Sequence, residues 1–341
     1  MKKEQSKQNV KVLSFKEAIR KRPGMYFGEI NSLAVNRAIY EAVANSVDQY
    51  LAGLATKVSL EIKDDLILVS DDGPGLPYEQ PAPDSKFSSL AEYYLMNHHD
   101  SPTADDHAPH IHLIGGGLGL AALNVASEYI NVRSSNGSSV WSQQFGRGEI
   151  LKQAISKDCQ NPSGTTLEIK LDRDIFQEYK ADHFDARKTL FELAHFYPGL
   201  KVCFQGETFI ARKGLLDLAF IHYRNLPVAI DFSPAVRFFF HESLEGVQVQ
   251  VAAIGDADKS TQYLSWVNGT SSVEGGTHVD ALNNVFAAAN WRPGLALIHV
   301  IMHDPRYAGP SKDALKSVEV KKVIETLLTE PIKAFRASLI K

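Results

Sequence analysis

Residues 33–51 read LAVNRAIYEAVANSVDQYL and form the clearest helical pattern of the chain. Their apolar side chains recur at helical spacing, which predicts an amphipathic helix with Asn31 or Ser32 as its N-cap. Glu41 and Asn45 are four residues apart, so both are expected to project from the same side of this helix. The apolar positions are Val35, Ile39, Val43, Val47, Tyr50 and Leu51.

The pair Glu41 and Asn45 combines a carboxylate with an amide on one helix face. A carboxylate in this position can orient an attacking water, and an amide oxygen is a ligand that Mg²⁺ accepts. The alternative is that both are solvated polar residues beside an apolar stripe. The choice between these interpretations depends on the segments that follow.

A second segment centres on Asp71. Alternation over residues 58–62 and an apolar run at 66–69 predict a β-hairpin, and Asp71 comes where its second strand ends. The glycines of the following stretch, DDGPG at 71–75, let the backbone approach a flat ligand. The carboxylate can accept a hydrogen bond from an exocyclic amine such as that of adenine. The alternative is a plain turn, since Asp, Gly and Pro are common turn residues.

A third segment is the glycine run at 115–119, which precedes a helix predicted over 118–126. Free backbone N–H groups at the start of a helix can bind phosphate. The run lacks the Gly-x-x-x-x-Gly-Lys-Ser/Thr pattern of a P-loop. Residues 117–122 loosely match a dinucleotide fingerprint, but the acidic residue expected about twenty positions later is missing. Together the three segments indicate an ATPase.

The bulk composition supports a soluble chain of two domains. Its 341 residues exceed one ordinary core, and 44% hydrophobic and 22% charged residues are near average values. No apolar run approaches a membrane span, no signal peptide is visible, and two cysteines are too few for a disulfide framework. We therefore expect a cytoplasmic protein with no membrane association. A net charge of −4 limits any DNA contact to a local patch or a partner.

The remaining pattern predicts sheets covered by helices, with a domain boundary near residues 212–215. Strands are expected at 129–133, 140–145, 165–171, 236–240, 247–254, 262–267 and 295–302, and helices at 88–96, 181–196, 277–289 and from 318 onward. Residues 97–112 show no period and predict a mobile loop that could act as a lid. The loop could bind zinc, although the spacing matches no standard site. Its candidate ligands are His98, His99, Asp100, Asp105, Asp106, His107, His110 and His112.

Motifs in both halves of the chain resemble the ATPase region of bacterial type IIA topoisomerases. That family contains the B subunit of DNA gyrase and its topoisomerase IV counterpart, within the GHKL ATPase superfamily. The matching residues are RKRPGMYFG (20–28), EAVAN (41–45), DDGPGLP (71–77), LGLAALNVAS (118–127), GT (164–165), VN (267–268), EGGTH (274–278), DP (304–305) and SK (311–312).

The resemblance implies an α+β fold in which a Bergerat α/β sandwich, residues 1–212, is followed by a ribosomal-S5-like transducer domain, residues 213–341. It implies that ATP and Mg²⁺ bind, with Glu41 as the general base and Asn45 as the magnesium ligand. Asp71 would read adenine with help from Thr165, and Lys312 would reach the γ-phosphate from the transducer. The other nucleotide-binding residues would be Gly73, Gly75, Pro77, Ile114, Gly115, Gly116, Gly117, Leu118, Gly119 and Leu120.

The resemblance also implies a homodimer that closes as a clamp on ATP binding. A gyrase-A-like or TOPRIM-bearing partner and DNA are the further partners that it suggests. The chain itself shows no TOPRIM region and no cleavage tyrosine domain, so alone it is expected not to cut DNA.

The sequence departs from the family at a few positions. Pro74 stands where the family usually has Arg and Gln49 where it has an acid, so a salt bridge is lost from both sides. Pro310 replaces the glutamine of a loop that contacts the γ-phosphate. These departures favour an alternative, an ATP-binding sensor or regulatory module with little hydrolysis. A histidine kinase of the same superfamily is a further alternative, but no phosphoacceptor helix is evident.

Overall fold

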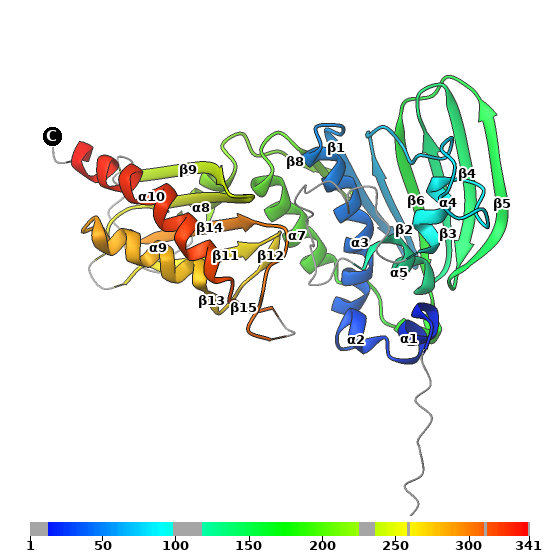
Figure 1. Cartoon of the computed structure of the whole chain (residues 1–341), viewed down its shortest axis with the longest axis horizontal. Helices are drawn as coiled ribbons and strands as arrows, with labels where there is room; N and C mark the ends of the chain where they lie inside the picture. The colour runs from blue at the N-terminus through cyan, green and yellow to red at the C-terminus, as the bar shows by residue number, and fades with distance from the viewer. Residues whose placement is uncertain (1–12, 98–117, 225–235, 258–259, 310–311, 340–341) are drawn as a thin grey trace, which may run out of the picture.

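The structure is a computed structural model that describes residues 13–97, 118–224, 236–257, 260–309 and 312–339. Within them the chain forms two large sheets, one in each half, with helices packed on both (Figure 1). The helices are α1 (Phe15–Lys21), α2 (Gly24–Phe27), α3 (Ser32–Leu51), α4 (Leu90–Met96), α5 (Gly119–Val125), α6 (Arg173–Phe176), α7 (His183–Phe196), α8 (Leu215–Arg224), α9 (Thr277–Ala288) and α10 (Val318–Leu339).

The strands are β1 (Lys57–Lys63), β2 (Leu66–Asp71), β3 (Ser127–Ser135), β4 (Ser139–Gly146), β5 (Glu149–Asp158), β6 (Gly164–Leu171), β7 (Lys201–Phe204), β8 (Glu207–Phe209), β9 (Arg237–Leu244), β10 (Val247–Ile254), β11 (Gln262–Val267), β12 (Thr270–Ser271), β13 (Gly275–Gly276), β14 (Leu295–Ile301) and β15 (Ala314–Leu315).

Helix α3 forms where its apolar spacing predicts it. Its N-cap is Asn31, whose Oδ1 accepts hydrogen bonds from the backbone N–H groups of Leu33 at 2.9 Å and Ala34 at 3.1 Å. These bonds satisfy donors that the first helical turn leaves without partners. The predicted apolar stripe is buried from Val35 to Val47, with Ile39 and Val43 fully inaccessible to solvent, and half-buried at its end. Burial of this stripe anchors the helix that carries the first candidate segment.

The first sheet has eight strands in the order β5-β4-β3-β6-β2-β1-β7-β8. The predicted hairpin is confirmed, because β1 and β2 pair antiparallel, and β1 pairs parallel with β7. Val58, Leu60 and Ile62 alternate along β1 and are buried on the face that α3 covers. Alternation of this kind is typical of a sheet with one covered face. Asp71 ends β2 as expected.

Strand β5 and helix α8 are the longest elements that the sequence did not predict. Strand β5 lies at the edge of the first sheet, and most of its residues are exposed, so it carries no alternating pattern that periodicity could detect. Helix α8 follows the predicted domain boundary and packs on β10 and β14 of the second sheet. The division of the chain at residues 212 and 213 itself stays a prediction.

The second sheet has five strands in the order β12-β11-β14-β10-β9. Helices α9 and α10 pack together on one face, and α8 covers part of the other. The central strand β14 is buried along its whole length, since both its faces are covered. The predicted strands and helices of this half are confirmed, with ends shifted by a few residues. A small two-stranded sheet of β13 and β15 lies beside it.

Helix α7 joins the two halves. The side chain of Gln250 on β10 donates a hydrogen bond of 3.0 Å to the carbonyl of Phe196, the last residue of α7. Trp266 on β11 donates one of 3.2 Å to the Glu192 carboxylate on the same helix. Residues of the first sheet and of β14 also belong to one continuous apolar cluster. The two halves therefore share buried surface as well as polar contacts.

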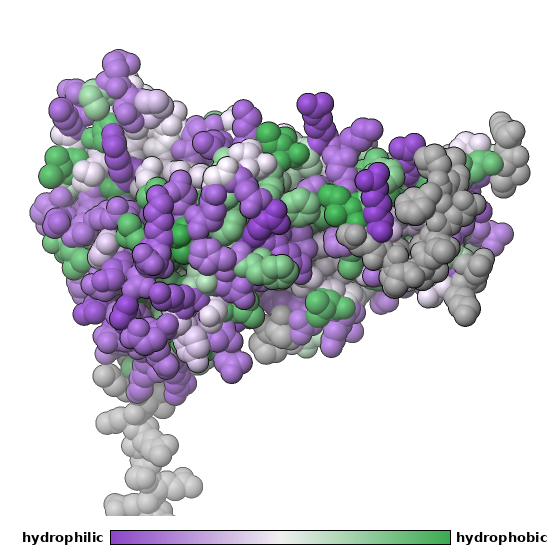
Figure 2. Space-filling view, turned by 180° about the vertical axis from the view of Figure 1, so that it is seen from behind, coloured by the Kyte–Doolittle hydropathy of each residue, from purple (hydrophilic) through white to green (hydrophobic). Residues whose placement is uncertain are grey.

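The surface carries scattered apolar residues among hydrophilic ones, as Figure 2 shows for one face. Scattered apolar residues of this kind are normal on folded chains. Across the described ranges, every helix is too short or too polar to span a bilayer.

Candidate active site

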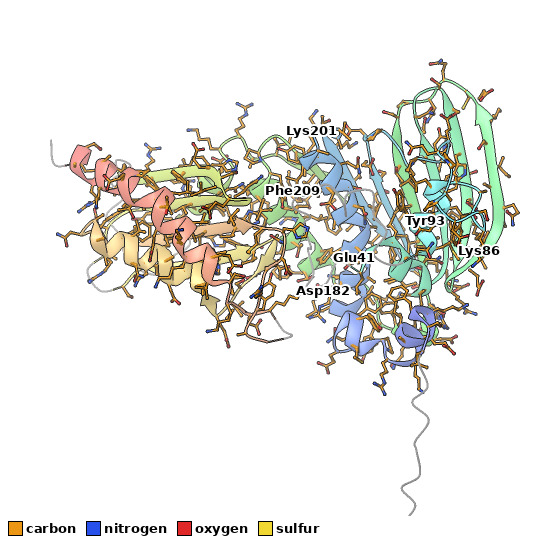
Figure 3. The ribbon with its side chains drawn as sticks, in the orientation of Figure 1. Glu41, Lys86, Tyr93, Asp182, Lys201 and Phe209 are labelled. Atoms are coloured by element: carbon orange, nitrogen blue, oxygen red, sulfur yellow. The ribbon has the colours of Figure 1, made fainter. Side chains whose placement is uncertain are left out.

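Glu41 lies at the centre of the molecule, on the long helix α3 (Figure 3). Its side chain is buried, and its Oε2 accepts a hydrogen bond of 2.8 Å from the backbone N–H of Gly119. Gly119 opens α5, whose N-cap residue Leu118 provides no side-chain cap. The carboxylate of Glu41 therefore caps α5 from a different helix. This contact brings together the first and third segments that the sequence singled out.

Burial raises the pKa of Glu41 from 4.5 to about 7. Desolvation disfavours the charged carboxylate, and the charge of Asp48 adds to the rise. The N–H groups of Gly119 and Leu118, and the positive charge of Lys312, oppose it. A carboxyl group whose pKa lies near neutrality can accept a proton and release it again at physiological pH, which suits a general base.

Asn45 lies one turn further along α3 and is half-buried. Its Nδ2 donates a hydrogen bond of 2.6 Å to the backbone carbonyl of Glu41, which orients the amide and leaves Oδ1 as the group able to ligate a metal. In the described part of the chain, no three His, Cys, Asp or Glu side chains gather into a metal cage. Mg²⁺ needs no such cage, because it usually keeps several waters and binds substrate phosphates. The residues present thus fit magnesium held jointly with a phosphate ligand.

Asp71 is held by three donors. Its Oδ2 accepts a hydrogen bond of 3.0 Å from the Ser46 hydroxyl, and its Oδ1 accepts from the N–H groups of Gly73 at 3.0 Å and Thr165 at 3.3 Å. Burial raises the pKa of the Asp71 carboxyl, and these three donors oppose the rise. Because each carboxylate oxygen can accept two hydrogen bonds, Oδ2 keeps one acceptor position for a ligand.

Two glycines near Asp71 lie against the backbone of neighbouring segments. Gly164 has a φ of +143°, and a Cβ at this position would collide with the carbonyl oxygen of Asp71. Gly75 has a φ of +82°, and a Cβ there would lie 2.5 Å from the carbonyl oxygen of Ser135. Both positions therefore require glycine. Gly164 and Ser46 were not among the predicted site residues, although Gly164 precedes Thr165 in a motif that the resemblance uses.

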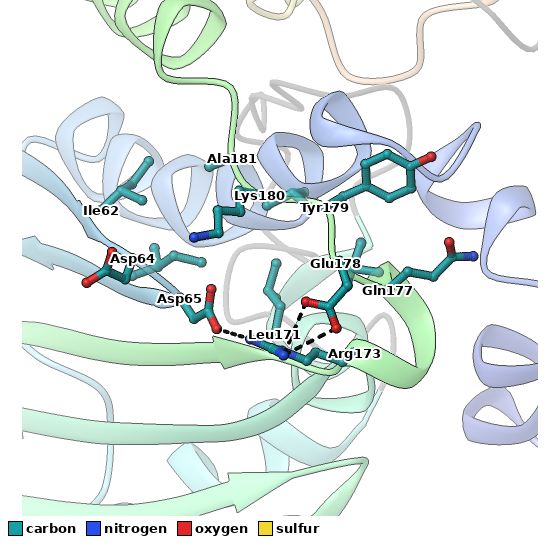
Figure 4. A pocket seen from close by; sticks show the side chains of 13 residues that line it. Ile62, Asp64, Asp65, Leu171, Arg173, Gln177, Glu178, Tyr179, Lys180 and Ala181 are labelled. Atoms are coloured by element: carbon teal, nitrogen blue, oxygen red, sulfur yellow. Dashed lines mark hydrogen bonds and ion pairs between the residues drawn. The ribbon is translucent and has the colours of Figure 1, made fainter.

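A pocket of about 170 Å³ adjoins Asp71. The residues around it are Asp71, Arg133, Ser135, Asn161, Pro162, Ser163, Gly164 and Thr166. A second cavity, of about 40 Å³, lies at the opposite end of β2, beside the β1–β2 turn (Figure 4). There Arg173 lies between the carboxylates of Asp65, at 2.5 Å, and Glu178, at 3.2 Å. This cavity has room for little more than water, and its ion pairs tie the turn to the segment after β6.

Lys312, in the second half of the chain, interacts electrostatically with Glu41. It has a left-handed backbone, with a φ of +60°, and is half-buried. Burial lowers the pKa of Lys312, whereas the negative charge of Glu41 raises it. The two residues therefore influence each other electrostatically. The contact with the γ-phosphate that the resemblance implies for Lys312 stays a prediction.

Some predicted site residues lie outside the described residues or away from the carboxylates. The described ranges do not include the histidine-rich loop, Pro310, or the residues Ile114, Gly115, Gly116 and Gly117. Leu118 is half-buried at the N-cap of α5, and Leu120 is buried in its first turn. Pro77 lies in the turn after Gly75, where its carbonyl accepts a hydrogen bond from Gln80. Gln49 packs beside Gly73, while Pro74 is exposed, so this uncharged pair forms no salt bridge.

No family model matches the chain. Two similar proteins are the B subunit of DNA topoisomerase 4 from Mycoplasma genitalium and the B subunit of DNA gyrase from Thermotoga maritima. The first is 27% identical over 97% of this chain and 56% of its own length, and the second is 28% identical over 96% and 56%. The chain is a homologue of the B subunits of bacterial type II topoisomerases. It spans about half the length of these curated relatives.

Solved structures agree with this assignment. The 43K ATPase domain of Thermus thermophilus gyrase B, solved in complex with an aminocoumarin, superposes on this gyrase-B-like chain with a TM-score of 0.78. The match is 21% identical and covers 95% of this chain and 90% of the domain. The ATPase region of Saccharomyces cerevisiae topoisomerase II matches with a TM-score of 0.68 and 17% identity, over 98% of this chain and 100% of its own. The predicted α+β fold class is confirmed, since the chain has the fold of these two ATPase regions.

Proposed function

We propose that this chain binds ATP with Mg²⁺ and hydrolyses it, and that nucleotide binding closes a homodimer. The observation that carries the proposal is the buried Glu41 carboxylate, with a pKa of about 7, bound to the N–H of Gly119 at 2.8 Å. The carboxylate occupies donors at the start of α5 that a phosphate would otherwise use. A terminal phosphate arriving there would release the carboxylate at the position where a base is needed.

In this mechanism each residue has one role. The Oδ2 of Asp71 accepts a hydrogen bond from the exocyclic amine of adenine, while Ser46 and Thr165 hold the carboxylate in place. Glu41 takes a proton from the attacking water. Asn45 would hold the magnesium ion, which would supply charge stabilisation for the phosphates. Lys312 places a positive charge against the terminal phosphate, so that nucleotide state and the position of the second half are linked.

The wider assignment is also a proposal. We place the chain in the cytoplasm, as the ATPase part of a type II topoisomerase or as a stand-alone relative of that part. Its partners would then be a second copy of itself, a gyrase-A-like or TOPRIM-bearing protein, and DNA. What supports this is the homology to gyrase B and topoisomerase IV B over nearly the whole chain.

The test compares ATP turnover with ATP binding in the parent chain and in Glu41→Gln. We expect steady Mg²⁺-dependent phosphate release from the parent chain. Glu41→Gln should lose turnover by about a hundredfold or more while binding ATP with similar affinity, because a general base contributes about 10²–10⁴-fold. Binding without turnover in the parent chain would favour the sensor alternative. Absence of both would refute the ATPase proposal.

Light scattering with a non-hydrolysable ATP analogue tests dimer closure, and a persistent monomer would contradict it.

A further inference from the structure

The ammonium group of Lys312 lies over the ring of Tyr307, with Nζ 5.1 Å from the ring centroid. A cation at this distance from an aromatic face is attracted by the negative charge density of the ring. Burial raises the pKa of Tyr307 to about 12, so the phenol stays neutral at physiological pH. The contact is therefore one between a cation and a neutral ring.

The backbone fixes this contact. Tyr307 forms a bridge with Leu315, and Ala308 donates a hydrogen bond of 2.9 Å to the carbonyl of Ala314. Strand β15 in turn pairs with β13, next to the start of α9. Tyr307 and Lys312 thus both belong to a segment that is anchored to the second half of the molecule. Their proximity does not depend on a flexible terminus.

Lys312 interacts electrostatically with Glu41, yet the two form no ion pair within 4.0 Å among the described residues. A direct pair would favour the charged carboxylate and lower the pKa of Glu41, which would weaken it as a base. The Tyr307 ring offers the ammonium a partner that cannot take its proton and does not neutralise Glu41. The ring can therefore hold the lysine near the site without forming an ion pair with Glu41 and without lowering the pKa of that carboxyl group.

We propose that Tyr307 is a positioning residue that holds the Lys312 ammonium beside Glu41 when no nucleotide is bound, and releases it to the terminal phosphate when ATP binds. This inference rests on the proposed function. A phosphate with two or more negative charges attracts the ammonium more strongly than a neutral ring does. The transfer would bias the backbone around Lys312, and with it β15, toward the nucleotide. The competing explanation is that Tyr307 merely packs against the core of the second half.

The first experiment measures the contact itself in the nucleotide-free chain. Lysine labelled with ¹³C at Cε is incorporated, and the Lys312 signal is assigned by its loss in Lys312→Arg. We expect its ε-proton resonance to be shifted upfield by the ring in the parent chain and in Tyr307→Phe, and to return to the position of a solvated lysine in Tyr307→Leu. An identical shift in all three proteins would overturn the proposal.

The second experiment follows the transfer. Addition of a non-hydrolysable ATP analogue with Mg²⁺ should move the Lys312 resonance away from its ring-shifted position, whereas ADP, which lacks the terminal phosphate, should not. Tyr307→Leu should raise the affinity for the non-hydrolysable ATP analogue by about three- to tenfold, because the ring competes with the terminal phosphate for the ammonium only in the free chain. Its affinity for ADP should be unchanged, and Tyr307→Phe should keep the parent affinity for the analogue. Tyr263→Leu, which alters a half-buried tyrosine of β11 bonded to Asn283, is the matched control and should leave both readouts unchanged.

The outcomes separate this inference from the proposed function. If the parent chain binds no ATP but the resting upfield shift depends on Tyr307, the proposed function fails and the resting contact stands. If ATP is hydrolysed and Tyr307→Leu binds the ATP analogue with the parent affinity and keeps the resting upfield shift, the function stands and the positioning role is refuted. A change of analogue affinity in Tyr307→Phe equal to that in Tyr307→Leu would also refute it, because the hydroxyl rather than the ring would then be responsible.

Discussion

The imidazole of His299 stacks on the ring of Phe196, with centroids 4.4 Å apart and planes inclined by 30°. His299 belongs to β14 and Phe196 ends α7, so the pair joins the two halves of the chain. The Nε2 atom of His299 accepts a hydrogen bond of 3.2 Å from the backbone N–H of Gly269, so the ring proton is on Nδ1. Among the described residues, Nδ1 has no hydrogen-bond partner. Burial lowers the pKa of His299 from 6.5 to about 3, so the junction contains a neutral imidazole.

This burial predicts a pH dependence of stability. Between pH 6.5 and about pH 3, His299 is protonated in the unfolded chain but neutral in the folded chain. The free energy of unfolding therefore falls as the pH drops through this window. Within this window, each drop of one pH unit lowers the free energy of unfolding by about 1.4 kcal/mol through His299. His278, whose pKa burial lowers to about 4, acts in the same direction, whereas Glu41, with its raised pKa, acts in the opposite one between pH 4.5 and about 7.

His299→Leu isolates the contribution of one histidine. Denaturant unfolding at several pH values between 6.5 and 4.5 should give a slope shallower by about one proton in the variant than in the parent chain. The other titrating groups contribute equally to both proteins and cancel. His303→Leu, at an exposed position, is the control and should keep the parent slope. Parallel curves for His299→Leu and the parent chain would show that His299 is not buried in its neutral form.

The raised pKa of Glu41 predicts the pH profile of hydrolysis. A general base must be deprotonated, so kcat/KM for ATP should rise with pH and level off above about pH 7. The rising limb should be absent from the residual activity of Glu41→Gln. A profile without an inflection between about pH 6 and 8 in the parent chain would argue against Glu41 as the base.

Asp71 and Asp72 are adjacent carboxylates with different partners, and they predict different phenotypes. Asp71→Asn should weaken ADP binding by about tenfold or more, because a hydrogen bond to a charged group contributes about 1.5–3 kcal/mol. Asp72 instead accepts hydrogen bonds from the backbone of Thr56 at 2.7 Å and Lys57 at 2.8 Å. Asp72→Asn should therefore lower thermal stability and leave ADP affinity intact. Calorimetric titration measures the affinities, and equal losses in both variants would contradict the assignment.

Asn45 predicts a change in the magnesium requirement. Asn45→Ala removes the amide oxygen and should raise the Mg²⁺ concentration that gives half-maximal turnover by about tenfold. Even residues that only support a metal ligand typically change metal affinity by about 10- to 100-fold when they are replaced. Gln49→Ala alters the next turn of the same helix at a half-buried position and should leave the requirement unchanged. An unaltered magnesium dependence in Asn45→Ala would exclude the amide as a ligand.

Periodicity predicted the elements that present one face to solvent. Helix α3 and the β1–β2 hairpin follow from residues a few positions apart, and the structure confirms both. Strand β5 was not predicted, because it is exposed on both faces and so lacks the alternation of apolar and polar residues by which a strand is recognised in a sequence. This rule has exceptions, because β14 was predicted although it is buried along its whole length, and α8 was missed although it has one buried face.

The candidate site divides in the same way. Spacing along a helix and the position of a strand end marked Glu41, Asn45 and Asp71 as candidate residues, because these relations span only a few residues. Their roles stay predictions. Contacts between distant segments could not be read in this way. The hydrogen bond from Gly119 to Glu41, the one from Ser46 to Asp71 and the ring of Tyr307 under Lys312 arise from packing. Packing also sets desolvation, and desolvation is why a carboxyl of ordinary intrinsic acidity acquires a pKa of about 7.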